Sequence, residues 1–304
     1  MKIVIAGGTG FLGHPLTASL VQDGHDVVVL TRNEHARVAD GARAVVWDLQ
    51  RALSPWAAEI DGADAVINLA GEPIAAHRWT AAQKHRIEDS RVLATQRIAR
   101  AIVEATKPPA LLLNGSAVGY YGHGGDTVIT EETGAGHDFL AGVCRRWETQ
   151  AVAASTAGTR VVCLRTGLVL AKEGGALPKM LPPFRLGLGG RLGSGRQYWP
   201  WIHHQDWHRL VRFVLDTPDI VGALNATAPT PVTNDEFTRE LGRALGRPTP
   251  FPVPRFALHL LLGEMADSLL LSGQRTSATK STERGFRFMY PTLALALDAI
   301  LHHE

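Results

Sequence analysis

The first 170 residues alternate short apolar runs with longer segments of helical periodicity. The apolar runs are nearly continuous in Val, Ile, Leu and Ala, which is typical of strands buried on both faces of a sheet. They predict strands at residues 2–6, 26–30, 42–47, 65–69, 110–114 and 160–165, with helices at 11–23, 80–104 and 140–157 between them. Strands that alternate with helices form parallel sheets, because parallel neighbours need a crossover connection. The sequence therefore predicts an α/β fold with a doubly wound parallel sheet.

The first predicted strand runs directly into a glycine-rich loop with the spacing G-x-x-G-x-x-G, at Gly7, Gly10 and Gly13. Gly7 suits a tight turn, Gly10 lets the backbone approach a ligand, and Gly13 lets the next helix pack on the sheet. The N-terminus of that helix would present free N–H groups to phosphates. The alternative is a turn without a ligand, but the position between strand and helix favours the pyrophosphate of a dinucleotide. Contacts are expected from Gly7, Thr9, Gly10, Phe11, Leu12 and Gly13.

The end of the second predicted strand indicates which dinucleotide binds. NAD sites usually carry a carboxylate here for the ribose 2′-hydroxyl, whereas this chain has Thr31 and Arg32, with Arg37 nearby. The Arg32 guanidinium can hold a 2′-phosphate through charge-assisted hydrogen bonds, and Thr31 can add a hydroxyl. We therefore expect NADP(H); the alternative is a solvated Arg32 with Glu34 at the ribose. Asp48 is expected either to accept from the adenine amino group or to be an exposed turn residue.

After residue 170 the regular alternation is lost, and glycines and prolines cluster between residues 174 and 195. A late apolar run at 222–227 predicts one more strand of the sheet, and residues 233–245 and 256–271 predict helices.

These patterns predict two domains. Residues 1–170 are expected to form a Rossmann domain that binds NADP, and residues 171–304 a smaller C-terminal α/β domain that forms the substrate cleft. The chain is expected to rejoin the sheet at about residues 202–227, so the boundary is not a single cut.

Composition excludes several classes of partner. A net charge of +2 over 304 residues gives no reason to expect nucleic acid, and no apolar stretch is long enough for a bilayer, so no membrane partner is expected. The two cysteines, Cys144 and Cys163, lack metal-ligand spacing and fit a reducing compartment. We expect a cytoplasmic protein that acts on a small molecule; the oligomeric state is left open.

Further motifs resemble those of the extended short-chain dehydrogenases/reductases, and more closely their atypical, epimerase-like branch. The resemblance covers essentially the whole chain, and residues 256–290 resemble the small domain of that branch. Members are usually labelled NAD-dependent epimerase-like proteins and have no agreed substrate. The motifs are residues 68–72, Arg78-Trp79, Ser90-Arg91, 119–122, Trp147-Glu148, 164–167, 183–190, 201–203 and 231–234.

The resemblance implies further contacts with the cofactor. Leu69, Ala70 and Gly71 are expected to pass along a cofactor ribose, and the segment from Thr166 to Val169 is expected beside the nicotinamide.

Two charged residues are also expected in the cofactor site. Glu72 is expected at the mouth of the nicotinamide pocket, with a hydrogen bond to the loop at Arg78 as the alternative. Arg91 is expected to reach the phosphates or the adenosine end of the cofactor, unless it is a helix-surface residue.

Ordinary members of the superfamily use a Tyr-x-x-x-Lys pair, in which the tyrosine exchanges a proton with the substrate and the lysine lowers its pKa. No tyrosine of this chain has a lysine four residues later. Counting back from Trp147-Glu148 places Leu140 and Cys144 at the two positions. The usual pair is therefore absent.

Ser116 matches the usual catalytic serine, and Tyr120 and Tyr121 follow it within reach of the same cleft. Either tyrosine could donate a proton, or one could only pack against the nicotinamide. Without a lysine, a phenol here is expected to keep a pKa near 10. Ser116, Tyr120 and Tyr121 are the candidate catalytic residues.

The group His203, His204, Asp206 and His208 could suggest a metal site. Adjacent histidines on a strand would point to opposite faces, so no metal is expected. Trp199 and Trp201 are expected either to line the pocket or to lie at a domain interface.

Two functions follow from these features. The first is an NADP(H)-dependent oxidoreductase or epimerase-like enzyme acting on a small polar substrate. The second is a non-catalytic NADP(H)-binding sensor or regulator, which the absence of Tyr-x-x-x-Lys favours.

Overall fold

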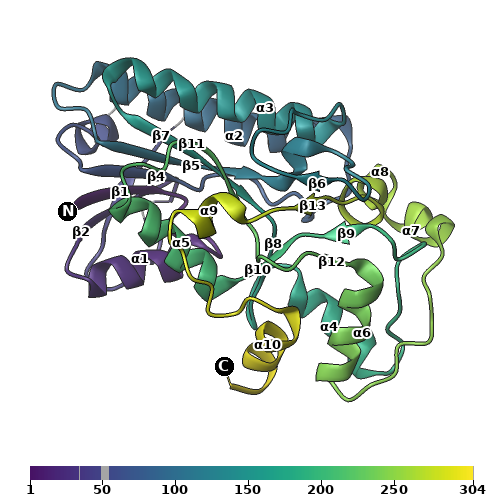
Figure 1. The fold of residues 1–304 in the computed structure, drawn as a ribbon. Coiled ribbons are helices and arrows are strands. Elements are labelled where there is room, and N and C mark those ends of the chain that lie inside the picture. The colour runs from purple at the N-terminus through teal and green to yellow at the C-terminus, as the bar shows by residue number, and fades with distance from the viewer. Residues whose placement is uncertain (34, 49–54, 304) are drawn as a thin grey trace.

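The centre of the protein is a parallel sheet of seven strands in the order β11-β7-β5-β4-β1-β2-β3. The computed structural model describes residues 1–33, 35–48 and 55–303 (Figure 1). The strand order reverses between β1 and β4 in the middle of the sheet. The carboxyl ends of these two strands are therefore the topological switch point of a doubly wound fold. The strands are β1 (Lys2–Ala6), β2 (Asp26–Thr31), β3 (Arg43–Val46), β4 (Ala65–Asn68), β5 (Leu111–Ala117), β7 (Arg160–Thr166) and β11 (Gly222–Ala226).

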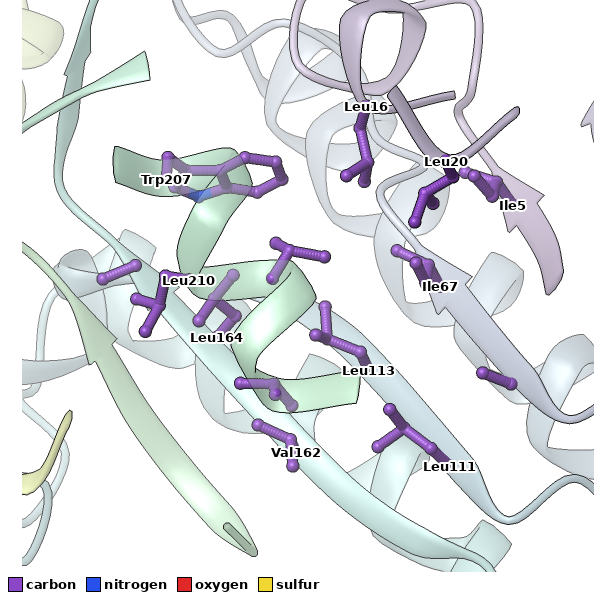
Figure 2. Packing of buried hydrophobic residues seen from close by; sticks show 14 of the residues in the cluster. Ile5, Leu16, Leu20, Ile67, Leu111, Leu113, Val162, Leu164, Trp207 and Leu210 are labelled. Carbon is purple, nitrogen blue, oxygen red and sulfur yellow. The ribbon is translucent and has the colours of Figure 1, made fainter. Parts of the chain in front are cut away.

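Helices cover both faces of this sheet. On one face lie α1 (Gly13–Gln22) and α5 (His204–Asp216), whose Leu16, Leu20, Trp207 and Leu210 pack on β1, β4, β5 and β7 (Figure 2). On the other face lies α2 (Ala81–Glu104), with α3 (Phe139–Val152) and the helical turn Ala153–Ala157 beside it. Because successive strand residues face opposite sides, each strand contributes alternate residues to the two cores. The predicted α/β fold is confirmed.

The apolar run at residues 222–227 contains β11, which pairs in parallel with β7 at one end of the sheet. The remaining strands form three two-stranded sheets, β8–β10, β9–β12 and β6–β13. The remaining elements are the helical turns Pro55–Glu59 and Val118–Tyr121, β6 (Val128–Ile129), β8 (Leu168–Leu170), α4 (Leu177–Arg185), β9 (Tyr198–Trp199), β10 (Trp201–His203), β12 (Val232–Thr233), α6 (Asn234–Ala244), α7 (Arg255–Leu262), α8 (Glu264–Ala266), the turn Asp267–Leu271, β13 (Arg275–Thr276), α9 (Thr279–Glu283), α10 (Leu293–Asp298) and the turn Ala299–His303.

A third hydrophobic cluster joins α4, α6 and α10 beyond the sheet. Trp199 and Trp201 are buried in this cluster, so they pack in a core and do not line an open pocket. The division at residue 170 stays a prediction.

One predicted helix, residues 256–271, is wrong as a single element. It is interrupted at Gly263, where φ is +61° and α7 ends. A positive φ ends a helix, and glycine adopts it at little cost because it has no Cβ. Across the described residues, no helix combines the length and the apolar character that crossing a bilayer would require.

Candidate functional site

The glycine-rich loop folds so tightly that side chains are excluded at two of its glycines. A Cβ on Gly7, where φ is +81°, would lie 2.7 Å from the carbonyl carbon of Leu69. A Cβ on Gly13 would lie 2.1 Å from the carbonyl oxygen of Gly7. At Gly10 the nearest such atom is 3.3 Å away, and Gly10 and Thr9 are exposed. The loop is thus closed against the protein and open on its outer face.

Helix α1 begins at this loop without a side-chain cap at Leu12, among the described residues. Within the helix His14 N donates to Gly10 O at 2.9 Å and Pro15 has no N–H, so a phosphate here would meet the positive end of the helix dipole and the main chain that precedes His14. The Phe11 ring packs on Gly174 and Gly175, where an added Cβ would lie 2.4 and 3.1 Å from ring carbons. A cleft of about 320 Å³ opens beside Phe11 and is lined by Leu12, Pro15, Ala171, Lys172, Glu173, His204 and His208.

The end of β2 presents the residues expected at the 2′-position of the cofactor. Arg32 and Arg37 are exposed, and the buried Thr31 hydroxyl accepts from the main-chain N–H of Asn33 at 3.2 Å. Asp48 is half-buried. The alternative residue, Glu34, lies outside the described residues.

Asn68 fixes the start of the loop that follows β4. Its buried side-chain amide donates to Asn114 Oδ1 at 2.7 Å and to Thr95 Oγ1 at 2.8 Å, and its Oδ1 accepts from Ala70 N at 3.2 Å. Leu69 and Ala70 are half-buried beside Gly7. The residues expected along the ribose therefore lie against the glycine-rich loop.

The same loop is held to α2 farther on. Glu72 N donates to Ser90 Oγ at 2.9 Å, and Arg91 donates to the main-chain oxygens of Glu72 at 3.0 Å and Ile87 at 2.9 Å. Burial lowers the pKa of Arg91. Arg91 is therefore a half-buried residue of the loop wall, and Glu72 is positioned through its main chain.

At the end of β5, Ser116 enters a buried ionic network. Its hydroxyl donates to Glu148 Oε1 of α3 at 2.6 Å. Arg165 of β7 donates to both oxygens of Glu148, from Nε at 2.9 Å and from Nη2 at 2.8 Å. Burial opposes the charge on Arg165, but the hydrogen bonds and charge of Glu148 raise its pKa. The pair has the bidentate geometry that makes guanidinium–carboxylate contacts strong.

The two tyrosines occupy different environments in this network. The Tyr121 hydroxyl accepts from Arg165 at 3.0 Å and donates to Asn225 Oδ1 of β11 at 2.7 Å. Burial raises the pKa of Tyr121 to about 12, so the expected value near 10 is wrong for this residue. Tyr120 is half-buried, and its ring lies 3.5 Å from the Arg165 guanidinium. Tyr120 is the more accessible phenol.

The C-terminal segment covers this part of the sheet edge. Gly124 N donates to Gly273 O at 3.0 Å, and Gln274 donates to Gly122 O. Asn225 Nδ2 donates to Ser277 O at 3.1 Å. Residues 273–277 therefore lie over the loop that follows β5.

Thr166 and Val169, which were expected beside the nicotinamide, make contacts with the hydrophobic core. Thr166 Oγ1 accepts from Trp207 Nε1 at 3.1 Å, and Val169 is buried in the same hydrophobic cluster as Trp207. Cys144 is also buried. Burial raises the pKa of its thiol to about 11, with Glu148 raising it further and Arg91 opposing this.

The group of His203, His204, Asp206 and His208 makes contacts within the fold. The rings of His203 and His204 stack at 4.7 Å, so the expectation that they face opposite sides is wrong, because His204 already begins α5. The Asp206 carboxylate accepts from the main-chain N–H groups of Met289 and Tyr290, both at 2.8 Å. Within the described ranges no group of His, Cys, Asp and Glu has an arrangement that could hold a metal ion.

Sequence reasoning assigned no role to Glu148, Arg165 or Asn225. Two of them stand in the motifs Trp147-Glu148 and Leu164-Arg165, so a signal existed. Their partnership depends on the register that sets Ser116 of β5 opposite Arg165 of β7, which the sequence does not encode locally.

Comparisons with family models, known sequences and solved structures all point to the same family. Residues 3–225 match the NAD dependent epimerase/dehydratase family, and residues 253–300 match a domain of unknown function, DUF1731. Epimerase family protein YfhF of Bacillus subtilis is 38% identical over 302 residues, 99% of this chain and 98% of that protein.

The human epimerase family protein SDR39U1 is 35% identical over 304 residues, 99% of this chain and all of that protein. The crystal structure of its isoform 2, solved with NADPH, has a TM-score of 0.89 and 34% identity, with full coverage of both chains. The chain belongs to the NAD dependent epimerase/dehydratase family, in the atypical epimerase-like branch of the short-chain dehydrogenases/reductases.

Proposed function

We propose that this protein binds NADP(H) along the carboxyl edge of the sheet and acts as an oxidoreductase or epimerase-like enzyme on a small polar substrate. The observation that carries the proposal is the loop at Gly7 and Gly13, where added side chains would strike the main chain, while Gly10 stays open to a ligand. Such a loop before an uncapped helix suits a pyrophosphate. The NADPH in the human relative supports this choice of ligand.

The position of Arg32 supports NADP(H) over NAD(H). A 2′-phosphate at the end of β2 would meet an exposed guanidinium, which binds phosphate through paired charge-assisted hydrogen bonds. NADH lacks this phosphate and would gain nothing from Arg32.

A binding titration tests this part of the proposal. NADPH and NADH are titrated against the wild type, Arg32→Asp and the control Arg247→Asp, an exposed arginine that follows α6. We expect the wild type to prefer NADPH, and Arg32→Asp to weaken NADPH roughly 10- to 100-fold with little change for NADH. A wild type that prefers NADH would overturn the assignment.

The catalytic part of the proposal depends on the end of β5. Ser116 and Tyr120 lie beside the segment that the C-terminal residues cover, and ligands of open α/β sheets bind outside the carboxyl ends of the strands. We assign substrate contact to Ser116 and Tyr120. Tyr121 supports them, because its hydroxyl already donates to Asn225 and accepts from Arg165 within the protein.

A second function, a non-catalytic NADP(H) sensor, is favoured by one specific observation. The positions of the usual Tyr-x-x-x-Lys pair hold Leu140 and a buried Cys144, neither of which can perform that chemistry.

Label transfer distinguishes an oxidoreductase from the sensor. The protein is incubated with NADPH deuterated stereospecifically at the nicotinamide C4 and with a broad metabolite extract. An oxidoreductase transfers deuterium to a metabolite, and Ser116→Ala abolishes the transfer. Binding of NADPH without any transfer would exclude a net reduction and leave the sensor or an epimerase, which returns the hydride to its own substrate.

A further inference from the structure

Arg91 is a desolvated cation whose hydrogen bonds go to neutral acceptors. It donates to two main-chain carbonyls, and its guanidinium lies 5.3 Å from the centre of the Trp147 ring. No ion pair joins it to a carboxylate among residues 1–33, 35–48 and 55–303. The Glu72 carboxylate acts on Arg91 without forming an ion pair with it, so the cost of burying the cation is only partly offset and an anionic partner would be favourable.

The guanidinium lies flat against the loop that follows β4. A Cβ on Gly71 would be 3.0 Å from Cζ of Arg91, so the glycine makes room for the guanidinium. A guanidinium has five N–H donors, and the two main-chain carbonyls together with the Ser90 hydroxyl, at 3.5 Å, take up three of them. Nε–H and one N–H of Nη2 therefore remain outside these three hydrogen bonds.

The order of the strands fixes which part of a dinucleotide can reach Arg91. Along the edge, Arg32 follows β2, the glycine-rich loop follows β1, Gly71 follows β4, and Ser116 ends β5. A ligand with its 2′-phosphate at Arg32 and its pyrophosphate at α1 must continue over β4 toward β5. The half that passes Gly71 is then the nicotinamide half.

The neighbours of Arg91 agree with this position. The charge of Arg91 acts on the Cys144 thiol, which also interacts with Ser116. Arg91 and Ser116 are therefore both neighbours of Cys144, and the strand order places Ser116 of β5 away from Arg32 at the end of β2. Of the two contacts expected for Arg91, this position agrees with the phosphates and not with the adenosine end.

We propose that Arg91 binds the ribose and phosphate oxygens of the nicotinamide half of NADP(H), through the guanidinium donors that the loop leaves free. This inference rests on the proposed function and deepens it. In this role Arg91 supplies the cation at the nicotinamide end of a site in which Cys144 stands where a lysine would be expected.

The test compares a whole ligand with its adenosine half. NADPH and 2′,5′-ADP, which lacks the nicotinamide half, are titrated against the wild type, Arg91→Gln, Arg91→Lys, Arg32→Gln and Arg100→Gln. Arg32→Gln is the mirror variant at the adenosine end. Arg100→Gln is the matched control, an exposed arginine of the same helix that pairs with Glu104.

We expect Arg91→Gln to weaken NADPH roughly 10- to 100-fold and to leave 2′,5′-ADP within about twofold of the wild type. Arg91→Lys should lose less NADPH affinity than Arg91→Gln, because it keeps the positive charge. Arg32→Gln should weaken the binding of both ligands. Retained 2′,5′-ADP affinity also shows that the variant is folded; if Arg91→Gln does not fold, Arg91→Lys carries the same comparison.

Two results would overturn the inference while leaving the proposed function intact. Equal loss of both ligands would mean that Arg91 acts on the fold or on the adenosine half, and an unchanged NADPH affinity would mean that it does not touch the cofactor. A wild type that binds neither ligand would overturn the proposed function together with the inference.

Discussion

The hydroxyl of Ser116 donates its proton to Glu148 over 2.6 Å, and this direction is fixed by the rest of the network. Arg165 has only donors, so Glu148 must accept from it, and an ionised carboxylate can only accept from Ser116 as well. Ser116 therefore offers lone pairs, and not a proton, to any group that meets it. A substrate group at this position is expected to be a hydrogen-bond donor, such as a hydroxyl.

The coupling between Ser116 and Glu148 can be measured by a double-mutant cycle. Unfolding free energies are compared for the wild type, Ser116→Ala, Glu148→Gln and the double variant. We expect a coupling energy of about 1 kcal/mol or more. Either single substitution already removes the hydrogen bond, so the second substitution cannot remove it again. Effects that add within about 0.5 kcal/mol would show that the two residues are independent.

Removing Arg165 should be among the most destabilising changes at the site. Arg165→Met leaves Glu148 buried without its counter-charge, and we expect a loss of about 3–5 kcal/mol in unfolding free energy. The control is Arg146→Met, which breaks an exposed ion pair with Glu88 and should cost about 1 kcal/mol or less. If chemical denaturation shows equal losses for both variants, the network does not stabilise the fold as described.

The raised pKa of Tyr121 predicts a loss of stability at high pH. Between about pH 10 and the folded-state pKa of about 12, the unfolded chain has released this proton and the folded protein still holds it. The unfolding free energy therefore falls as pH rises through this range, by roughly 3 kcal/mol.

Tyr121→Phe removes this titration and isolates its contribution. The variant is less stable at pH 8 because Arg165 and Asn225 lose a partner, but it should lose less additional stability from pH 10 to 12. Tyr120→Phe is the control and should follow the wild type. Parallel pH profiles of wild type and Tyr121→Phe, measured by denaturant unfolding, would contradict the burial of this phenol.

The sheet and the cofactor loop could be predicted because their signals are local. Continuous apolar runs and the glycines at 7, 10 and 13 each specify a conformation over a few residues, and the sheet follows from their alternation. The break at Gly263 was missed because the apolar periodicity continues through it. The Ser116–Glu148–Arg165 contacts join three elements, and only the register of β5 with β7 and the packing of α3 bring them together.

The close approach at Gly13 predicts a severe effect from one methyl group. Gly13→Ala places a Cβ 2.1 Å from the carbonyl oxygen of Gly7, so the loop or α1 must shift. We expect a loss of about 1–3 kcal/mol in unfolding free energy and at least a tenfold loss of NADPH affinity. Gly134→Ala is the matched control, since an added Cβ there meets no atom within 4 Å. Wild-type melting and NADPH binding by Gly13→Ala would contradict the geometry of the loop.

The central claim is that NADP(H) lies along the carboxyl edge from β2 to β5. A crystal structure of the protein with NADP⁺ measures this directly. The account predicts the 2′-phosphate within hydrogen-bonding distance of Arg32, the pyrophosphate at the start of α1, and the nicotinamide ring beside Ser116 with its ribose next to Arg91. A cofactor bound in the reverse direction, or outside the glycine-rich loop, would contradict it.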